Sequence, residues 1–302
     1  MPATIDAVMV KLGSVIMGSR EGDAAVGTTH GSSVSDVFAL AREHRKRGLA
    51  AAYCPTASID DRDRLRDIRD AFAAAGVVIA EVGGWRNMLH PDPAEGKRER
   101  QRMADYLAIA DEVDARCAIT CIGSPGGPGQ GSHDAFNFTP DAFDAAVENA
   151  RWLIDTVKPK RTRFVYEIYP FSVADTPANI RRLLDAVDRP EFAAHMDLVN
   201  LINCPRLYYR SGDVAREVVR LFGDRIVSAH AKDLKMAEDV SVIMHEVRPG
   251  CGNIDYAAYL RVLHELPHTV PLMLEHLHTQ EEYDLGVDHI RAVAAAEQIP
   301  LA

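Results

Sequence analysis

Four acidic or imidazole side chains in this sequence have the types and the spacing of metal ligands. They are Glu167, Asp197, His230 and Glu275. Each stands near the carboxyl end of a separate short apolar run, of the kind that forms strands buried on both faces of a parallel sheet. The four runs span 163–169, 192–199, 225–231 and 270–276. Because the strands of a (β/α)8 barrel present their carboxyl ends at one mouth, we expect a single divalent metal site there.

The ligand types indicate both the metal and the reaction. Three carboxylates and one imidazole suit Mn²⁺, Mg²⁺, Co²⁺ or Zn²⁺ better than a metal that seeks thiolates, and we favour Mn²⁺. A substrate chelated through neighbouring oxygens would have its carbonyl polarised, which acidifies the adjacent C–H and stabilises the enediolate left when the proton departs. Glu167 and Glu275 belong to the fifth and eighth runs, so they can approach the substrate from different sides. We therefore predict that these two glutamates move the proton.

The remaining chain supplies the elements that would position this site. Four further apolar runs span 5–11, 49–54, 76–82 and 116–122, and helical stretches lie between the runs at 35–47, 61–75, 97–113, 140–157, 176–187, 213–222 and 255–266. Strict alternation of strand and helix over 302 residues favours an α/β protein with one (β/α)8 TIM barrel in a single domain, residues 1–302. An open doubly wound sheet would need a glycine fingerprint after the first strand, and the sequence has none there.

Composition and charge narrow the class of partner. With 47% hydrophobic residues the chain can bury a large core, but no apolar run is long enough to span a bilayer. A formal net charge of −10 disfavours nucleic acid, and the basic runs at 42–47 and 97–102 are interleaved with acids, as on solvated helix faces. The five cysteines are scattered without zinc-type pairing, and the first residues lack a signal core. We expect a cytoplasmic protein without a membrane or nucleic-acid partner.

Several segments together resemble a known family. They lie at 80–87, 166–168, 195–197, 229–233, 248–256 and 274–276, and they cover essentially the whole predicted barrel. The chain resembles the sugar phosphate isomerase/epimerase superfamily, the xylose isomerase-like TIM barrels that also include metal-dependent apurinic endonucleases. The resemblance implies that Glu167, Asp197, His230 and Glu275 form the family's metal quartet and that the two glutamates are its acid/base pair.

Four other residues are candidates for binding the substrate. By the resemblance, Arg248 would bind a substrate oxygen, the alternative being a loop salt bridge. Lys232 lies two residues beyond His230 and shares its inward face, so it could bind hydroxyls or a carboxylate. His90 follows the third run, where either a substrate or acid/base role or a helix-capping role fits. Trp85 could stack on a sugar face or simply pack in the core.

Asn200 marks a departure from the family pattern. Ketose epimerases of this kind usually carry a histidine three residues after the metal aspartate, and here that position is Asn200. Epimerisation of a free ketose is therefore in doubt, although metal binding is not. The apurinic endonucleases need further histidines, including one at this position, so DNA repair is disfavoured. We retain Asn200 among the substrate-binding candidates.

Neighbours of the quartet have predicted supporting roles. Glu81 could be an acid behind the ligands, and His195 either hydrogen-bonds a ligand or is a satisfied core histidine. His276 and His278 follow Glu275, but their parity is opposite to that of Glu275, so both are left out of the metal site. Cys117 and Cys121 are interpreted as small core residues.

Three functional hypotheses follow. The first is a metal-dependent isomerase or epimerase of a sugar, keto sugar or sugar acid. The second is a lyase on the same scaffold, either for elimination from a 3-keto glycoside, as in the C-glycoside deglycosidases, or for decarboxylation of a 3-oxo sugar acid. The third, a non-catalytic sugar-binding barrel, ranks last because both glutamates are present. A homo-oligomer and a small partner subunit both stay open.

Overall fold

Eight parallel strands in the described part of the chain form one sheet that curls into a barrel. The computed structural model describes residues 9–16 and 36–302. The barrel strands are β1 (Lys11–Gly13), β2 (Ala51–Tyr53), β3 (Val78–Gly83), β4 (Cys117–Thr120), β5 (Arg163–Tyr166), β6 (Ala194–Asp197), β7 (Ile226–Ala231) and β10 (Pro271–Leu274). Their order in the sheet is β5-β4-β3-β2-β1-β10-β7-β6. The predicted (β/α)8 barrel is therefore confirmed.

The two ends of this sheet meet between β5 and β6. An isolated parallel bridge joins Phe164 to Phe192, and two backbone hydrogen bonds accompany it, from Ala193 N to Phe164 O at 2.9 Å and from Phe164 N to Glu191 O at 2.8 Å. This short contact nearly closes the barrel, so the carboxyl ends of the strands surround one mouth.

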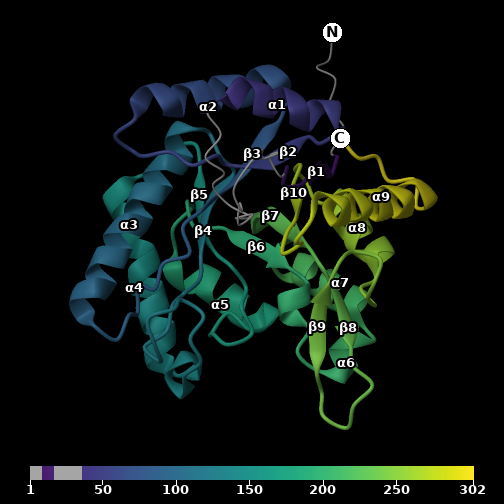
Figure 1. The fold of residues 1–302 in the computed structure, drawn as a ribbon. Coiled ribbons are helices and arrows are strands. Elements are labelled where there is room, and N and C mark those ends of the chain that lie inside the picture. The colour runs from purple at the N-terminus through teal and green to yellow at the C-terminus, as the bar shows by residue number, and fades with distance from the viewer. Residues whose placement is uncertain (1–8, 17–35) are drawn as a thin grey trace.

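Helices connect the strands and surround the barrel (Figure 1). They are α1 (Val37–Lys46), α2 (Arg62–Ala75), α3 (Pro93–Glu112), α4 (Pro140–Val157), α5 (Pro177–Val187), α6 (Pro205–Tyr208), α7 (Ser211–Phe222), α8 (Tyr256–His264) and α9 (Gln280–Ala296), with short 3-10 turns η1 (Ala135–Phe138), η2 (Val199–Leu201) and η3 (Gly223–Arg225). None of the helices in the described ranges is long and apolar enough to cross a membrane.

Helix starts follow the local capping chemistry. Thr279 begins α9 with a capping box, in which its side chain accepts from the amide of Glu282 and the Glu282 carboxylate accepts from the amide of Thr279. Asp92 caps α3 by accepting from the amide of Ala94, and Pro93 occupies the first helical turn. This cap explains why α3 begins at residue 93, four residues before the predicted helix at 97–113.

A two-stranded hairpin departs from the predicted alternation. Strands β8 (Asp233–Met236) and β9 (Met244–Val247) pair antiparallel between β7 and α8, and no such hairpin was predicted. Figure 1 shows it projecting away from the barrel beside α6. The hairpin matters for function because its first residues directly follow β7, which carries His230.

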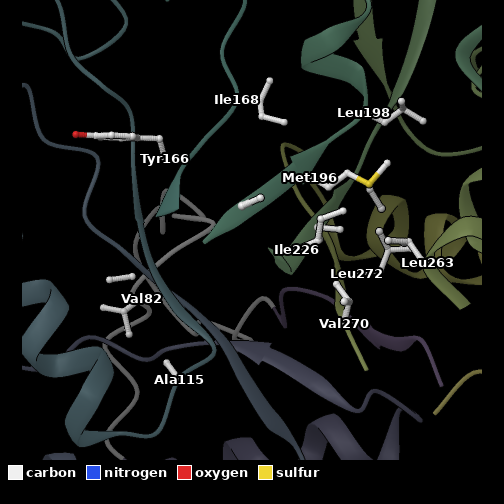
Figure 2. Close-up of a cluster of buried hydrophobic side chains, with 14 of the residues drawn as sticks. Val82, Ala115, Tyr166, Ile168, Met196, Leu198, Ile226, Leu263, Val270 and Leu272 are labelled. Atoms are coloured by element: carbon white, nitrogen blue, oxygen red, sulfur yellow. The ribbon is translucent and has the colours of Figure 1, made fainter. Parts of the chain in front are cut away.

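The core lies mainly between the barrel and its helices. Figure 2 shows part of it, with buried apolar side chains from several strands and the residues next to them, including Val82, Tyr166, Met196, Val270 and Leu272. Inside the barrel there are two smaller clusters of apolar residues, one that includes Met273 and one that includes Val165. Toward the carboxyl ends of the strands, polar side chains fill the interior of the barrel and form the site described below.

The predicted first strand differs in position. Of the run at 5–11, residues 5–8 lie outside the described residues, and β1 occupies Lys11–Gly13. The predicted helix at 35–47 begins one residue outside the described range and corresponds to α1. Six of the other predicted runs each contain one observed barrel strand, and β3 extends one residue beyond the run at 76–82.

Candidate metal centre and active site

Strand register brings the four predicted ligands to one height. Asp197 is the last residue of β6 and lies directly opposite His230 in the parallel pairing with β7. On the other side of β7, His230 lies opposite Met273, and Glu275 follows two residues later with the same side-chain parity. Glu167 comes directly after β5. All four side chains therefore point into the same end of the barrel.

The four side chains meet around the imidazole of His230. Its Nδ1 atom lies 2.9 Å from Glu275 Oε1, 3.4 Å from Asp197 Oδ2 and 3.5 Å from Glu167 Oε1. One ligand atom from each residue can be chosen so that all four lie within 4.8 Å of one another. The residues are buried, with Glu167 the most accessible at 7%. We call these four residues the quartet.

The spacing and the donors of the quartet fit a divalent cation. Neighbouring ligands at about 2.1 Å from an octahedral ion are about 3.0 Å apart, close to the separations observed here. His230 Nδ1 is buried and makes no hydrogen bond of good geometry within the described ranges, although three carboxylates surround it. An imidazole nitrogen and carboxylate oxygens that converge on one point form a donor set typical of Mn²⁺, Zn²⁺ and related ions, which bind the neutral imidazole.

Glu81 fixes the orientation of His230 from below. Its Oε2 atom lies 3.1 Å from His230 Nε2, and its Oε1 atom accepts a short hydrogen bond from the Ser228 hydroxyl. His195 Nε2 lies 3.4 Å from the same Oε1 atom. With a proton on Nε2 directed at Glu81, the Nδ1 atom of His230 faces the quartet, and its lone pair would become available to a metal ion that displaces the Nδ1 proton. Glu81, His195 and His230 form a second compact group of potential ligands, which shares His230 with the quartet.

Lys232 places an ammonium group among the quartet carboxylates. Its Nζ atom lies 2.6 Å from Glu275 Oε1, 2.7 Å from Asp197 Oδ2 and 3.4 Å from Glu246 Oε1. The side chain is only 2% exposed. The predicted inward orientation of Lys232 is thus observed, but the lysine contacts the ligands themselves. A divalent ion and the ammonium would therefore use the same oxygens.

Charge within the site sets the protonation of its groups. Burial raises the pKa of Asp197, but Lys232 and His230 outweigh it and hold the pKa at about 2. Burial also opposes ionisation of Glu275, yet His230 and Lys232 lower its pKa well below the ordinary value. Burial lowers the pKa of His230, whereas Glu275 and Glu81 raise it well above the ordinary value. The metal-free site is an ionised cluster of carboxylates with an imidazolium and an ammonium.

Glu167 stands at the more open side of the quartet. The indole Nε1 of Trp85 donates a 2.6 Å hydrogen bond to its Oε2 atom, and the Cys121 thiol lies 3.8 Å from the same oxygen. This hydrogen bond places Trp85 at the site, whether or not its ring also stacks on a substrate. The hydrogen bond to Oε2 fixes the carboxylate with its Oε1 atom 3.5 Å from His230 Nδ1.

Asn200 contacts a quartet residue, whereas His90 lies in the turn before α3. Asn200 donates from Nδ2 to Asp197 Oδ2 at 2.9 Å and to Ile168 O at 2.8 Å, while its amide donates to Asp197 Oδ1 at 3.1 Å. It therefore holds a predicted ligand in place. His90 accepts from the amide of Asp92 through Nδ1, in the turn before α3. This contact is the helix-capping alternative, and a substrate role for either residue stays a prediction.

A cavity of about 310 Å³ opens directly beside the quartet. Lys232 and Glu275 form its inner wall, and residues of the hairpin and of the segment after β10 complete it; they are Glu246, Val247, Arg248, Cys251, His276, Leu277, His278 and Glu282. Arg248 donates to Pro249 O at 3.0 Å and to the Cys251 sulfur at 3.1 Å. The volume is suitable for a monosaccharide-sized substrate.

Two residues of this cavity, Glu246 and His276, were not predicted from the sequence to take part in the site. Glu246, on β9, accepts a 2.7 Å hydrogen bond from His276 Nδ1 and pairs with Lys232. His276 has a φ of 58°, so the backbone turns sharply after Glu275 and directs the imidazole to the cavity. His276 Nε2 lies 3.7 Å from Glu275 Oε2, consistent with its exclusion from the predicted ligands. Glu246 was missed because its position depends on the hairpin.

The turn that carries Arg248 is held by Asp233. The Asp233 carboxylate accepts from the amides of Gly250 at 2.9 Å, Gly252 at 3.1 Å and Ile254 at 2.9 Å. Gly250 has a φ of 90°, which favours glycine, and a Cβ on Gly252 would collide with Asp233 and the backbone of Leu234. The Pro-Gly-x-Gly pattern seen in the sequence is thus a loop wrapped around one buried carboxylate.

Comparison with known proteins identifies the family. The family model described as xylose isomerase-like TIM barrel matches residues 43–293, so the chain belongs to this family. This membership confirms the resemblance seen in the sequence. A search of curated proteins found no significant match.

Solved structures with the same fold share little sequence with the chain. A xylose isomerase-like TIM barrel protein from Mycobacterium smegmatis in complex with magnesium has 17% identity and a TM-score of 0.62, covering 86% of this chain and 87% of its own. D-psicose 3-epimerase from Clostridium cellulolyticum with D-tagatose has 12% identity and a TM-score of 0.65, covering 96% and 100%. The probable 3-DHS dehydratase AsbF from Bacillus anthracis has 12% identity and a TM-score of 0.63, covering 87% and 94%. At these identities the similarity establishes the fold alone.

Proposed function

We propose that the protein is a divalent-metal-dependent isomerase or epimerase that moves a proton next to the carbonyl of a sugar, keto sugar or sugar acid. The single observation that carries the proposal is the convergence of Glu167, Asp197 and Glu275 on His230 Nδ1, beside a cavity of about 310 Å³. The family includes enzymes of this type among its structural neighbours, such as the D-psicose 3-epimerase.

The quartet would hold the ion, for which we propose Mn²⁺. When bound, a divalent cation polarises a substrate carbonyl and acidifies the adjacent C–H. Asp197 is fixed for this role by Asn200, and His230 is fixed by Glu81. The magnesium complex of a neighbour with the same fold supports a divalent metal in this proposal. The carboxylate-rich donor set favours Mn²⁺, Mg²⁺ or Co²⁺, with Zn²⁺ as a further alternative.

Glu167 and Glu275 would exchange the proton. Glu167 follows β5 and Glu275 follows β10, and their Oε1 atoms lie 3.5 Å and 2.9 Å from His230 Nδ1. Because they come from different strands, one would remove a proton from the substrate and the other would return it. The Trp85 indole holds Glu167 in position through Oε2. Glu275 faces the cavity, where Lys232 and His276 are close enough to stabilise its charged form.

The cavity beside Glu275 would bind the substrate. Arg248 and Lys232 supply donors for hydroxyl, carbonyl or carboxylate oxygens, and Trp85 supplies an apolar surface near Glu167. His90 would contact the substrate only if the turn before α3 faced it. Asn200 would contact the substrate in addition to its hydrogen bonds to Asp197. The whole chain would act as one catalytic domain in the cytoplasm, on a small carbohydrate and without a nucleic-acid or membrane partner.

A lyase on the same scaffold is the second candidate, and Asn200 favours it. Both hydrogens of Asn200 Nδ2 are used by Asp197 and Ile168, and an amide offers no proton of useful acidity where ketose epimerases carry a histidine. The same first proton abstraction would then lead to loss of a leaving group from a 3-keto glycoside or of carbon dioxide from a 3-oxo sugar acid. The probable dehydratase among the structural neighbours has the same fold.

Product mass separates the two candidates. The Mn²⁺-loaded protein would be incubated with a panel of ketoses, 3-keto glycosides and oxo sugar acids, and the products analysed by mass spectrometry. A product of unchanged mass in ordinary water, which carries deuterium at one carbon when the reaction is run in deuterated water, supports the isomerase. A split or lighter product supports the lyase. Activity that is equal in Glu167→Gln and wild type would contradict both. Native mass and co-purification would decide between a homo-oligomer and a small partner subunit.

A further inference from the structure

A second cavity lies at the opposite end of the barrel from the quartet. It has a volume of about 340 Å³ and is lined where strands begin: by Lys11 at the start of β1, by residues 76–79 at the start of β3, by Arg116 just before β4 and by Arg161 just before β5. Arg69 and Phe72 of α2 form another wall. Because the quartet lies at the carboxyl ends of the strands, this cavity has no part in the proposed reaction.

The charge of this cavity is the reverse of that of the whole protein. Four cationic side chains line it, with one carboxylate, Asp114, although the chain carries a formal net charge of −10. Two of these cations have carboxylate partners that do not line the cavity: Arg69 pairs with Asp70 at 3.1 Å, and Arg161 pairs with Glu112 at 3.6 Å.

Lys11 and Arg116 form no ion pair within residues 9–16 and 36–302. Partial burial lowers the pKa of Lys11, and the positive charges of Arg116 and Arg45 lower it further. The cations therefore repel one another across the cavity, and a bound anion would relieve that repulsion.

We propose that this cavity is a binding site for a small phosphate-bearing metabolite. Arg116 offers a planar fork suited to two phosphate oxygens, and Lys11 offers a compact charge from the facing strand. The accessible apolar residues Ala73 and Val78 on the cavity wall accommodate the organic part of the ligand. The volume lies in the usual range for small-molecule sites. The ligand would be either a sugar phosphate or a nucleotide, which share the recognised group.

Calorimetric titration of the full-length protein tests the site. The protein is first stripped of metal with a chelator, which is then removed, so that phosphate cannot act through the quartet. Pyrophosphate, glucose 6-phosphate and adenosine triphosphate are titrated separately, with sodium chloride of equal ionic strength as the reference. We expect saturable binding of one ligand per chain. Tighter binding of the sugar phosphate or of the nucleotide than of pyrophosphate identifies the source of the phosphate.

Variants of the lining residues test whether the ligand binds in this cavity. Arg116→Gln and Lys11→Gln should each weaken it about tenfold, the usual effect of losing one charge-assisted hydrogen bond. Lys97→Gln removes the same charge from an exposed position on α3 and should leave the affinity unchanged. Heat no larger than that of the salt reference, or equal affinity in Arg116→Gln and wild type, would overturn the proposal. Arg116 is exposed, so this variant decides the question even if Lys11→Gln does not fold.

Discussion

The Nζ atom of Lys232 lies 2.7 Å from the Oδ2 atom of Asp197, so an ammonium of the protein itself already neutralises a carboxylate that the proposed metal ion would use. The same ammonium lies 2.6 Å from Glu275 and 3.4 Å from Glu246. Glu246 thus offers Lys232 a third carboxylate partner, which lies outside the quartet. The metal affinity of the protein should therefore depend on a residue that is not itself a ligand.

Replacing Lys232 tests this competition. Lys232→Met should raise the affinity for Mn²⁺ about tenfold, because a positive charge near the ion is removed. The same change should lower the melting temperature of the metal-free protein, because Asp197 and Glu275 lose their counter-ion. Lys235→Met is the matched control, an exposed lysine three residues along that leaves the quartet untouched. An unchanged or weaker Mn²⁺ affinity in Lys232→Met would refute the competition.

Glu81 should control the metal affinity through His230. Glu81→Gln removes the charge that holds the proton on His230 Nε2, and loss of such a partner typically costs 10- to 100-fold in affinity. We expect a decrease of about that size in a Mn²⁺ titration, with the metal-free fold retained by circular dichroism. Glu217→Gln, on the exposed face of α7, serves as the control. Wild-type affinity in Glu81→Gln would mean that His230 is not a ligand through Nδ1.

The stability of the metal-free protein should fall in strong acid. The pKa of Asp197 is about 2 in the folded protein, against an ordinary value of 3.8, so its contribution is complete above the ordinary value and is lost as the pH falls through about 2. Urea unfolding at a series of pH values would measure this loss. In Asp197→Asn the free energy of unfolding should vary less over the same interval. An identical pH dependence in the two proteins would exclude this contribution.

The turn around Asp233 should be intolerant of a side chain at Gly252. Gly252→Ala places a Cβ against the Asp233 carboxylate and the Leu234 carbonyl, so we expect a loss of about 2 kcal/mol in the free energy of unfolding. Gly129→Ala is the control, because the atom nearest to its added Cβ is 3.5 Å away. Denaturant unfolding of the two variants would compare them. Equal stability would show that the turn relaxes without cost.

The barrel and the quartet were predictable because both follow from parity and order along the chain. Asp197 and His230 each end an apolar run, and parallel strands must bring such ends together. His195, Ser228 and Lys232 share faces with these residues for the same reason, since side chains two apart on a strand point the same way.

Contacts made across the barrel or through the hairpin were not predictable in this way. Glu246 reaches Lys232 only because β8 and β9 pair in one register, with Leu234 opposite Glu246. The bonds of Asn200 to Asp197 depend on the 3-10 turn after β6. The helix start at Pro93 was also missed, although Asp92 and Pro93 are a typical cap.

Metal content is the most direct test of the central claim. Wild type, Asp197→Ala and Glu217→Gln would be purified with Mn²⁺ present, dialysed and analysed by elemental mass spectrometry. We predict about one divalent ion per chain in wild type and Glu217→Gln, and a loss of the ion in Asp197→Ala, since a site with one missing carboxylate binds far more weakly. Absence of metal from the folded wild-type protein, or equal metal in Asp197→Ala, would contradict the claim that the quartet is a metal centre.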